Sequence, residues 1–196
     1  MLVGCDGIEV HTTMLKTILD SLDKHNDRCG ETKIIAIDGP AGSGKTTLSL
    51  QLEASLTPRA VTIHMDALYN GWSDALTPTL TRTLQNQIFT PLSLHKNIEY
   101  RPFDWFSQSP GPVITFEPPE FLILEGVGSA QAVTRKYAAL LIWIDVAPEV
   151  GLKRVLQRDG AEIENQMRIW QSQEANFFAK DQTRERVHLR MDGNTY

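Results

Sequence analysis

The sequence predicts a three-layer α/β/α fold built on a parallel five-stranded sheet. Short apolar runs alternate with longer segments of helical periodicity along the chain, and each main run is continuously apolar. This pattern is typical of parallel strands that helices cover on both faces. An acidic residue also stands at or just beyond the end of four runs, at Asp38, Asp66, Glu125 and Asp145. Because ligands of such sheets bind at the carboxyl ends of the strands, these acids indicate a site there.

The first elements are an N-terminal helix and two strand–helix steps. Apolar residues recur at helical spacing with charges on the other face over 9–28, which predicts an amphipathic helix. A β-branched run over 33–37 predicts a buried strand, and a glycine-rich loop then leads into a helix over 45–56. A second short strand is predicted over 61–64.

The middle of the chain contains a helix and a long irregular segment. Thr77 and Pro78 have the pattern of a cap and a first helical position, and the helix they begin is expected to stop at Pro91. Residues 97–120 are rich in proline and aromatic residues, so we expect irregular structure there, apart from a short strand over 113–116.

The last third of the chain completes the alternation. Apolar runs predict strands over 121–124 and 140–144, and helices are predicted over 148–157 and 162–180. A final strand over 187–191 brings the number of main strands to five.

Size and composition limit the classes of function. The chain has 196 residues and a formal net charge of −5, so we expect one domain over 1–196, with the N-terminal helix inside 1–30 and no broad surface for nucleic acid or anionic membranes. Cys5 and Cys29 form no disulfide framework, and neither a signal peptide nor a membrane span is recognised. We therefore expect a cytoplasmic protein, and a homo-oligomer is left open.

One motif explains the gathering of glycines after the first strand. Residues 39–46 fit G-x-x-x-x-G-K-[ST] in full, between a strand and a helix. Glycines let successive backbone N–H groups turn toward phosphate oxygens, and the helix adds its positive N-terminal end. Lys45 then reaches the β- and γ-phosphates of ATP, and the Thr46 hydroxyl reaches Mg²⁺. The expected nucleotide-binding residues are Gly39, Pro40, Ala41, Gly42, Ser43, Gly44, Lys45, Thr46 and Thr47.

Further motifs separate the classes of phosphate-loop protein. The chain has no N-K-x-D element of a GTPase and no L-S-G-G-Q-like signature of an ABC-type ATPase. Over roughly 33–180 it instead resembles the uridine kinase family of P-loop small-molecule kinases. Besides the loop, the motifs that carry this resemblance are 64–69 (HMDALY), 103–105 (FDW), 123–126 (ILEG) and Arg154-x-x-x-Arg158-Asp159. The opening Ile-Asp-Gly-Pro of 37–40 also resembles cytidylate kinases, which leaves the acceptor open.

The resemblance implies a P-loop NTPase fold of the nucleoside and nucleotide kinase type, and it implies roles at the acceptor. Asp66 would be the general base at the acceptor hydroxyl; the alternative is a loop acid or helix cap. The residues expected to line the acceptor site are Asp66, Tyr69, Arg101, Phe103, Asp104 and Trp105. The alternative for the aromatic residues is that they fill the core.

The resemblance also implies a metal site and a helical lid. Glu125 would hold Mg²⁺ with Thr46, and Asp38 is a rival for a role near the metal. Arg154 and Arg158 would act on the phosphates from a lid around 152–168; the alternative is a pair of solvated helix charges. The family often has another arginine after the Arg-Asp pair, but 160–164 contains none, and Arg168 is the candidate substitute.

We therefore predict an ATP- and Mg²⁺-dependent kinase that transfers the γ-phosphate to a hydroxyl of a small molecule, with a nucleoside as the first candidate. Lys45, Asp66, Arg154 and Arg158 are the expected catalytic residues. A sugar, a vitamin precursor or a nucleotide is the alternative acceptor. The alternative class is a non-catalytic or regulatory ATP-binding protein.

Overall fold

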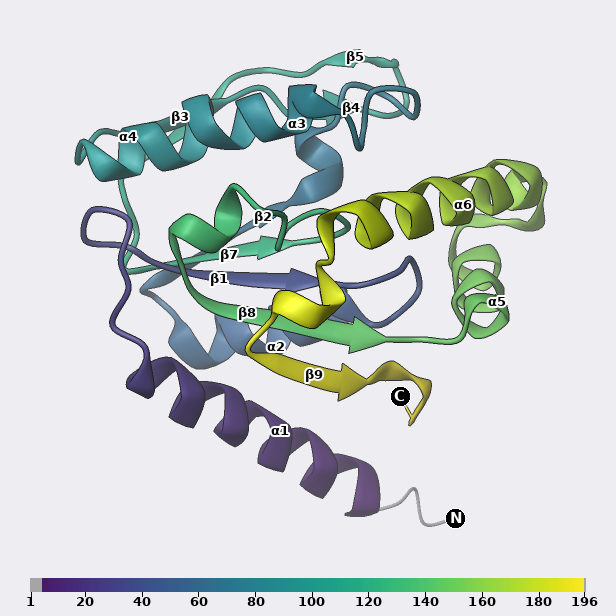
Figure 1. Cartoon of the computed structure of the whole chain (residues 1–196), viewed down its shortest axis with the longest axis horizontal. Coiled ribbons are helices and arrows are strands. Elements are labelled where there is room, and N and C mark those ends of the chain that lie inside the picture. Colours follow the sequence, from purple (N-terminus) through teal and green to yellow (C-terminus); the bar gives the residue numbers. More distant parts are fainter. Residues whose placement is uncertain (1–4, 196) are drawn as a thin grey trace.

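The central sheet of the computed structural model has five parallel strands in the spatial order β2-β7-β1-β8-β9 (Figure 1). The structure describes residues 5–195, and their side chains from 14 to 194. The predicted fold class is confirmed, and each predicted main strand is present. The strands are β1 (Lys33–Asp38), β2 (Ala60–His64), β7 (Phe121–Glu125), β8 (Ala138–Asp145) and β9 (Leu189–Asp192).

The register of the sheet brings several strand ends to one edge. Glu125, the last residue of β7, pairs with Ile37 of β1 on one side and with His64 of β2 on the other. Asp38 pairs with Trp143, close to the end of β8. The polar residues that end or follow these strands therefore lie at the carboxyl edge of the sheet.

Two apolar clusters cover the two faces of the sheet. On one face, α1 (Cys5–Lys24) and α2 (Lys45–Leu56) pack against alternate residues of the strands, with Ile18 and Leu52 fully buried. On the other face lie the helical segment 78–93 and α6 (Glu164–Asp181), whereas α5 (Pro148–Asp159) stands beyond the strand ends (Figure 1). The predicted helix over 9–28 ends at Lys24, and residues 1–4 of the predicted N-terminal segment lie outside the described residues.

The helix after Pro78 does not stop at Pro91, which corrects the prediction. It runs through α3 (Pro78–Thr83), a π-helical segment η2 (Leu84–Phe89) and α4 (Thr90–Ser93). At the end of η2, the N–H of Thr90 bonds to the carbonyl of Gln85, five residues earlier, as in a π-helix. Pro91 thus falls in the first turn of the next α-helical stretch, where a proline needs no N–H donor.

The segment 97–120 is more ordered than predicted. β3 (Ile98–Tyr100) and β6 (Ile114–Phe116) form an antiparallel pair, and β4 (Phe103–Asp104) pairs with β5 (Ser109–Pro110). The strand predicted over 113–116 is confirmed. The other three were missed because strands of two or three residues are too short to show a period of two.

Short helical turns connect the remaining elements. A 3₁₀ turn η1 (Met65–Leu68) follows β2, η3 (Thr134–Lys136) precedes β8, and η4 (Ala161–Ile163) joins α5 to α6. Two more turns, η5 (Arg184–Arg186) and η6 (Gly193–Thr195), flank β9.

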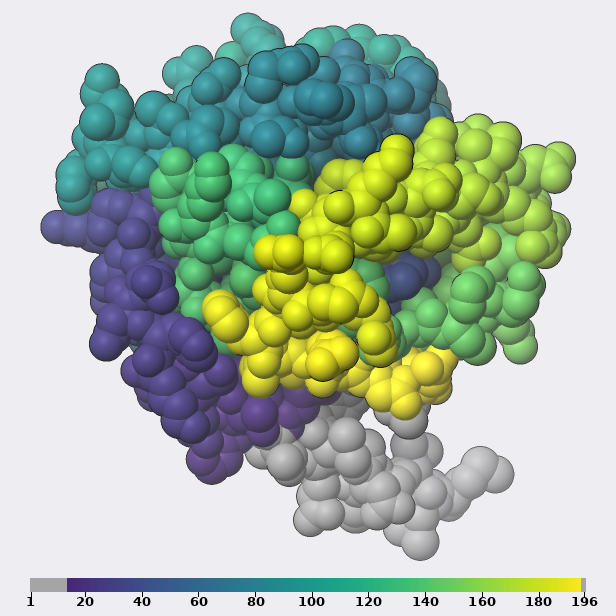
Figure 2. Space-filling model, viewed as in Figure 1, coloured from purple at the N-terminus to yellow at the C-terminus, as the bar shows by residue number. Residues whose placement is uncertain are grey.

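The surface of α3 and α4 lies along one edge of the molecule beside that of α6 (Figure 2). Among the described helices, none combines the length and the apolar character that a membrane span requires.

Candidate active site

The phosphate-loop motif forms a tight turn between β1 and α2. Gly39, Gly42 and Gly44 all have positive φ angles, of 140°, 76° and 98°. A side chain at Gly42 would place its Cβ 2.3 Å from the carbonyl oxygen of Gly151 in α5. The positive φ angles favour glycine at all three positions, and the close approach of α5 excludes a side chain at Gly42.

The N–H groups of the loop divide into occupied and available donors. The N–H of Ser43 bonds to the carbonyl of Pro40 at 3.2 Å, and that of Ala41 bonds to the carboxylate of Glu174. Within the described chain, no hydrogen bond uses the N–H of Gly42 or Gly44. The N–H groups of residues 45 and 46 belong to the first turn of α2, and N–H groups in a first helical turn have no acceptor within the helix. Four backbone N–H groups, those of residues 42, 44, 45 and 46, are thus available to an anion.

Lys45 provides the positive charge beside these donors. Its ammonium donates to the carbonyl of Pro40 at 2.8 Å, and the side chain is buried. Burial lowers the pKa of Lys45, whereas the nearby carboxylates of Glu125, Glu174 and Asp38 act in the opposite direction. One ammonium therefore faces three buried acids, and it lies where a phosphate would compete for it.

Asp38 organises the backbone at the end of β1. Its carboxylate accepts hydrogen bonds from the N–H groups of Gly39 at 2.7 Å, Gly128 at 3.0 Å and Ala130 at 2.8 Å. Burial raises its pKa to about 6, against the effect of these donors and of Lys45. Because both oxygens are held by backbone donors, the contacts favour an anchoring role for Asp38 over a role near a metal.

Glu125 joins the ends of β7 and β2 and the first turn of α2 into one polar cluster. It accepts a hydrogen bond from the hydroxyl of Thr46 at 3.2 Å, and its other oxygen lies 2.6 Å from Nδ1 of His64. The hydrogen bond with Glu125 raises the pKa of His64. The two oxygen groups predicted to hold Mg²⁺, those of Thr46 and Glu125, are therefore adjacent. His64, a residue to which the sequence assigned no role, fixes the carboxylate.

Asp66 lies in η1, directly after β2, and it lines a cavity together with residues of the phosphate loop. Partial burial raises its pKa, and the charge of Glu125 raises it further. Its backbone carbonyl accepts a hydrogen bond from the indole of Trp105 at 3.2 Å. A carboxylate with a raised pKa near an anion site has the properties of a general base.

A cavity of about 640 Å³ connects these groups. Its floor is the phosphate loop with Lys45, and Asp66 and Glu125 lie in its wall. A volume of this size suits a small-molecule ligand. Of the predicted site residues, those that line it are Ala41, Gly42, Gly44, Lys45, Thr46, Thr47, Asp66, Tyr69, Trp105, Glu125, Arg154 and Arg158.

Aromatic side chains form one side of the cavity. Trp72 packs edge to face against both Trp105 and Trp170, at centroid distances of 5.1 and 5.5 Å. The hydroxyl of Tyr69 donates to the carbonyl of Val127 at 2.7 Å, which fixes its ring in the wall. Trp72 and Trp170 were not predicted to line the cavity. In the sequence, an aromatic residue that lines a cavity cannot be distinguished from one that packs in the core.

Arg101, Phe103 and Asp104 lie outside this cavity. Arg101 and Phe103 line a neighbouring cavity of about 530 Å³, and the Arg101 guanidinium donates to the carbonyl of Gly111 at 3.3 Å. The carboxylate of Asp104 accepts from the N–H groups of Phe106 and Ser107, and so closes the turn between β4 and β5. Their predicted role at the acceptor has no support from this placement.

The two predicted lid arginines both reach the cavity, from α5. Arg154 donates to the carbonyls of Gly42 at 3.3 Å and Gly193 at 2.7 Å. Arg158 makes two hydrogen bonds of 2.7 Å with the neighbouring Asp159, and these raise its pKa. Arg168 instead pairs with Glu164 and Glu149 and does not line the cavity, so it does not replace the missing arginine in this conformation.

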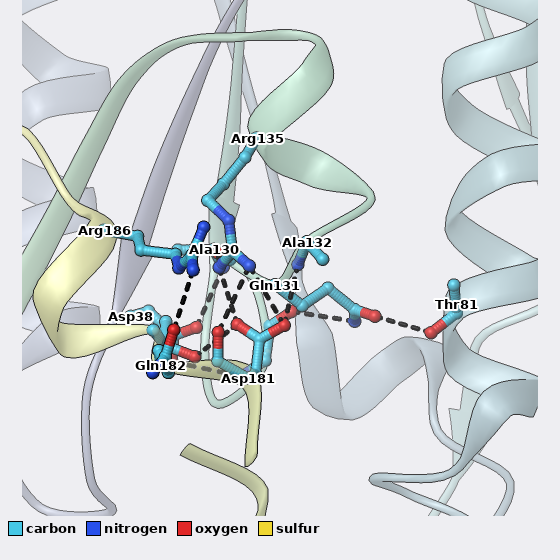
Figure 3. Close-up of polar contacts among 11 residues, drawn as sticks. Asp38, Thr81, Ala130, Gln131, Ala132, Arg135, Asp181, Gln182 and Arg186 are labelled. Atoms are coloured by element: carbon cyan, nitrogen blue, oxygen red, sulfur yellow. Dashed lines mark hydrogen bonds and ion pairs between the residues drawn. The ribbon is translucent and has the colours of Figure 1, made fainter. Parts of the chain in front are cut away.

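α6 is fixed at its C-terminal end to the loop that follows β7. The guanidinium of Arg135 bonds to the carboxylate of Asp181 at 2.6 Å, and the same carboxylate accepts from the N–H of Ala132 (Figure 3). Two residues earlier, the N–H of Ala130 is one of the three backbone donors that hold Asp38. A continuous set of polar contacts thus connects the end of α6 with the end of β1.

Comparison with known proteins supports the assignment of the fold. It does not show the activity, which must be argued from the site. No protein-family model matches the sequence, and no curated protein matches it as a relative. A structure described as a possible uridine kinase from Bacillus stearothermophilus is similar over 95% of this chain and 100% of its own, with a TM-score of 0.67 and 17% identity. D-glycerate 3-kinase from Cryptococcus neoformans var. grubii is similar over 86% of this chain and 87% of its own, with a TM-score of 0.55 and 12% identity.

The chain therefore has the fold of the P-loop kinases, and the resemblance to the uridine kinase family is confirmed at the level of the fold.

Proposed function

We propose that the protein is an ATP- and Mg²⁺-dependent kinase that transfers the γ-phosphate to a hydroxyl group of a small molecule. The observation that supports this proposal most directly is a single cavity that contains both the phosphate loop and Asp66. An anion site alone is compatible with any nucleotide-binding protein. A carboxylate of raised pKa in the same cavity provides a group for activating an acceptor.

The residues present fit a nucleoside triphosphate with Mg²⁺. The available N–H donors and Lys45 match the oxygens of phosphates, and Thr46 and Glu125 offer adjacent oxygen ligands. Among the described residues, no group of three or more His, Cys, Asp or Glu side chains would hold a metal alone. Mg²⁺ in kinases is held by one or two protein oxygens together with phosphates and water, so this set is sufficient. The metal would neutralise charge on the transferred group.

Each polar residue then has a distinct task. The loop and Lys45 hold the β- and γ-phosphates, and Arg154 and Arg158 lie where they would stabilise charge on the transferred group. Asp66 would accept the proton of the acceptor hydroxyl as that oxygen bonds to the γ-phosphorus and the bond from the γ-phosphorus to the bridging oxygen of ADP breaks. Alignment of the two substrates and electrostatic stabilisation together supply most of the rate enhancement in this chemistry.

The walls of the cavity favour an acceptor with a flat ring. Tyr69, Trp72 and Trp105 present aromatic surfaces close to Asp66, and such surfaces bind planar rings by stacking. We therefore propose a nucleoside as the first acceptor to test. The similar structures include one described as a possible uridine kinase and one D-glycerate 3-kinase, so sugars and other small alcohols belong in the same test, together with vitamin precursors and nucleotides.

The decisive experiment measures ADP formation with a panel of acceptors for the wild type and for Asp66→Asn. We expect Asp66→Asn to lower acceptor phosphorylation by about 10²- to 10⁴-fold, the usual contribution of general base catalysis, while ATP binding stays within about threefold. The control is Asp23→Asn, the same change at an exposed position on α1. ATP turnover that needs no acceptor and is unaffected by Asp66→Asn would contradict the kinase assignment.

A further inference from the structure

We propose that Glu174 is a positioning residue of the phosphate loop, and that it takes up a proton when a triphosphate binds there. This inference rests on one part of the proposed function, namely that the phosphate loop binds a nucleotide. It adds a residue that neither the motif nor the proposed chemistry includes.

Among the described residues, Glu174 is the side chain through which α6 bonds to the backbone of the phosphate loop. Its two carboxylate oxygens lie 3.1 and 3.3 Å from the N–H nitrogen of Ala41. The side chain is 3% exposed, although it is acidic. A buried carboxylate in this position holds one edge of the loop against the helix, and it leaves the N–H groups of Gly42 and Gly44 available.

The position of Glu174 on its helix connects the loop with the wall of the cavity. It shares the buried face of α6 with Met167, Trp170 and Phe178. Met167 and Trp170 also line the cavity. The hydrogen bond to Ala41 thus joins the helix that carries part of the ligand wall to the loop that would carry the phosphates, so the two surfaces keep a fixed spacing.

The charged and titratable groups around Glu174 come from three other elements. Lys45 faces it from α2, Asp38 from β1, and the phenol of Tyr69 from the end of η1. Burial raises the pKa of Glu174 to about 7; Lys45, the N–H of Ala41 and Trp170 act in the opposite direction, and Asp38 adds to the rise. Glu174 is therefore close to half-ionised at neutral pH before any ligand binds.

A bound triphosphate changes this balance in one direction. It brings several negative charges next to Lys45 and draws the ammonium toward phosphate oxygens, so the ionised form of Glu174 loses its main stabilising partner. The pKa of Glu174 is then higher in the complex than in the free protein, and binding takes up protons. By linkage, the nucleotide affinity decreases as the pH rises from the free pKa to the bound pKa.

Calorimetry of nucleotide binding tests this directly. The magnesium complex of ATPγS is titrated into the wild type at pH 7.5, in buffers of different ionisation enthalpy. We expect an uptake of about half a proton per nucleotide, the value for a group that passes from mostly ionised to mostly protonated. We also expect the dissociation constant to increase about two- to fivefold between pH 7 and pH 8.

Two variants separate the role of Glu174 from general effects. In Glu174→Gln, the proton uptake and the change of affinity with pH should both disappear, whereas Glu164→Gln, the same change at a half-exposed position of α6, should keep both. A purely structural role would change the melting temperature of Glu174→Gln and leave the proton count unaltered. If Glu174→Gln does not fold, the wild-type proton count decides.

Nucleotide binding by the wild type without proton uptake would overturn this inference and leave the proposed function intact. Proton uptake that persists in Glu174→Gln would overturn it as well. Failure of the wild type to bind the nucleotide at all would instead contradict the proposed function, and this inference with it.

Discussion

Glu125 is the residue at which most polar contacts of the candidate site meet. It lies at the end of a central strand, it is 5% exposed, and it contacts both the phosphate-loop helix through Thr46 and the neighbouring strand through His64. A carboxylate held from two sides has few orientations available, so its position relative to the loop is set before a ligand binds. Such support is what keeps metal ligands in place in other proteins.

We predict that Glu125→Gln raises the Mg²⁺ concentration needed for half-maximal activity by about 10- to 100-fold. The amide keeps the size of the side chain but removes the negative charge that attracts the cation. The measurement is a Mg²⁺ titration of ADP formation. The control is Glu120→Gln, just before β7, where the side chain pairs with the exposed Arg59. Equal Mg²⁺ dependence of the Glu125 variant and the wild type would exclude Glu125 as a ligand.

We predict that Lys45→Met lowers kcat by about 10²- to 10³-fold, the range seen when one charge-stabilising donor is removed. The change removes the ammonium that we propose to face the phosphates, and it leaves a side chain of similar length. Steady-state kinetics with saturating acceptor measures the effect. Lys153→Met, on the exposed side of α5, is the matched control and should keep the wild-type kcat. A wild-type kcat in Lys45→Met would refute the placement of the γ-phosphate.

At the scale of elements, the phosphate loop and α5 are in direct backbone contact. A Cβ added to Gly151 would lie 2.5 Å from the carbonyl oxygen of Ala41, and one added to Gly42 would meet Gly151. The two glycines let the helix and the loop approach without side chains between them. The helix that carries Arg154 and Arg158 is therefore positioned by the loop itself.

We predict that Gly151→Ala destabilises the protein and weakens nucleotide binding. Helix propensity alone predicts the opposite, a gain of about 0.5–1 kcal/mol for alanine over glycine. The added methyl group must instead push α5 away from Ala41. Chemical denaturation and nucleotide titration check both effects. An increase in stability, as propensity predicts, would show that the contact between α5 and the loop is looser than the structure has it.

The ion pair between Arg135 and Asp181 holds the C-terminal end of α6, the helix whose Met167 and Trp170 line the cavity (Figure 3). Both side chains are largely buried, at 16% and 13% exposure. We predict that Asp181→Asn lowers the free energy of unfolding by about 2–4 kcal/mol, because it leaves a buried guanidinium without its counter-charge. Urea denaturation measures this. Asp20→Asn, which breaks an exposed pair with Lys16, should produce no measurable change.

The elements differ in how far the sequence predicts them. Long periodic segments and the glycine motif are predicted well, because their signals span ten or more residues or require a fixed spacing. The short hairpins after Ile98 carry no such signal, and a π-helical segment that admits Pro91 is not visible in any local pattern. Glu174 did leave a signal that went unused: it is a charged residue on the apolar stripe of a helix, with Trp170 and Phe178 four positions away on either side.

For the whole molecule, the order of the strands determines where the functional groups meet. β1 lies between β7 and β8, so the loop that follows it is next to Glu125 on one side and next to α5 on the other. Residues that are far apart in sequence, such as Thr46 and Glu125, therefore make direct contact. The sequence predicts that the acids converge at this edge, but which of them bond with one another depends on register and side-chain packing.

We predict that the magnesium complex of ATPγS stabilises the folded protein as a whole. At a ligand concentration 100 times the dissociation constant, binding adds about 2.7 kcal/mol to the stability. For a chain of this size, that corresponds to an increase of about 5–10 °C in the melting temperature. Differential scanning fluorimetry measures the shift, and Lys45→Met should show a smaller one. No shift for the wild type at any ligand concentration would argue against nucleotide binding.

The side chain of Tyr69 lines both the cavity that contains Asp66 and the neighbouring cavity that contains Arg101. One ring therefore forms part of the partition between two hollow spaces. Replacing it with a smaller residue would join them into a longer chamber, at a cost in folding stability. We expect such a variant to bind an enlarged synthetic analogue that the parent protein rejects, which would give chemists a selective handle on this protein in a mixture.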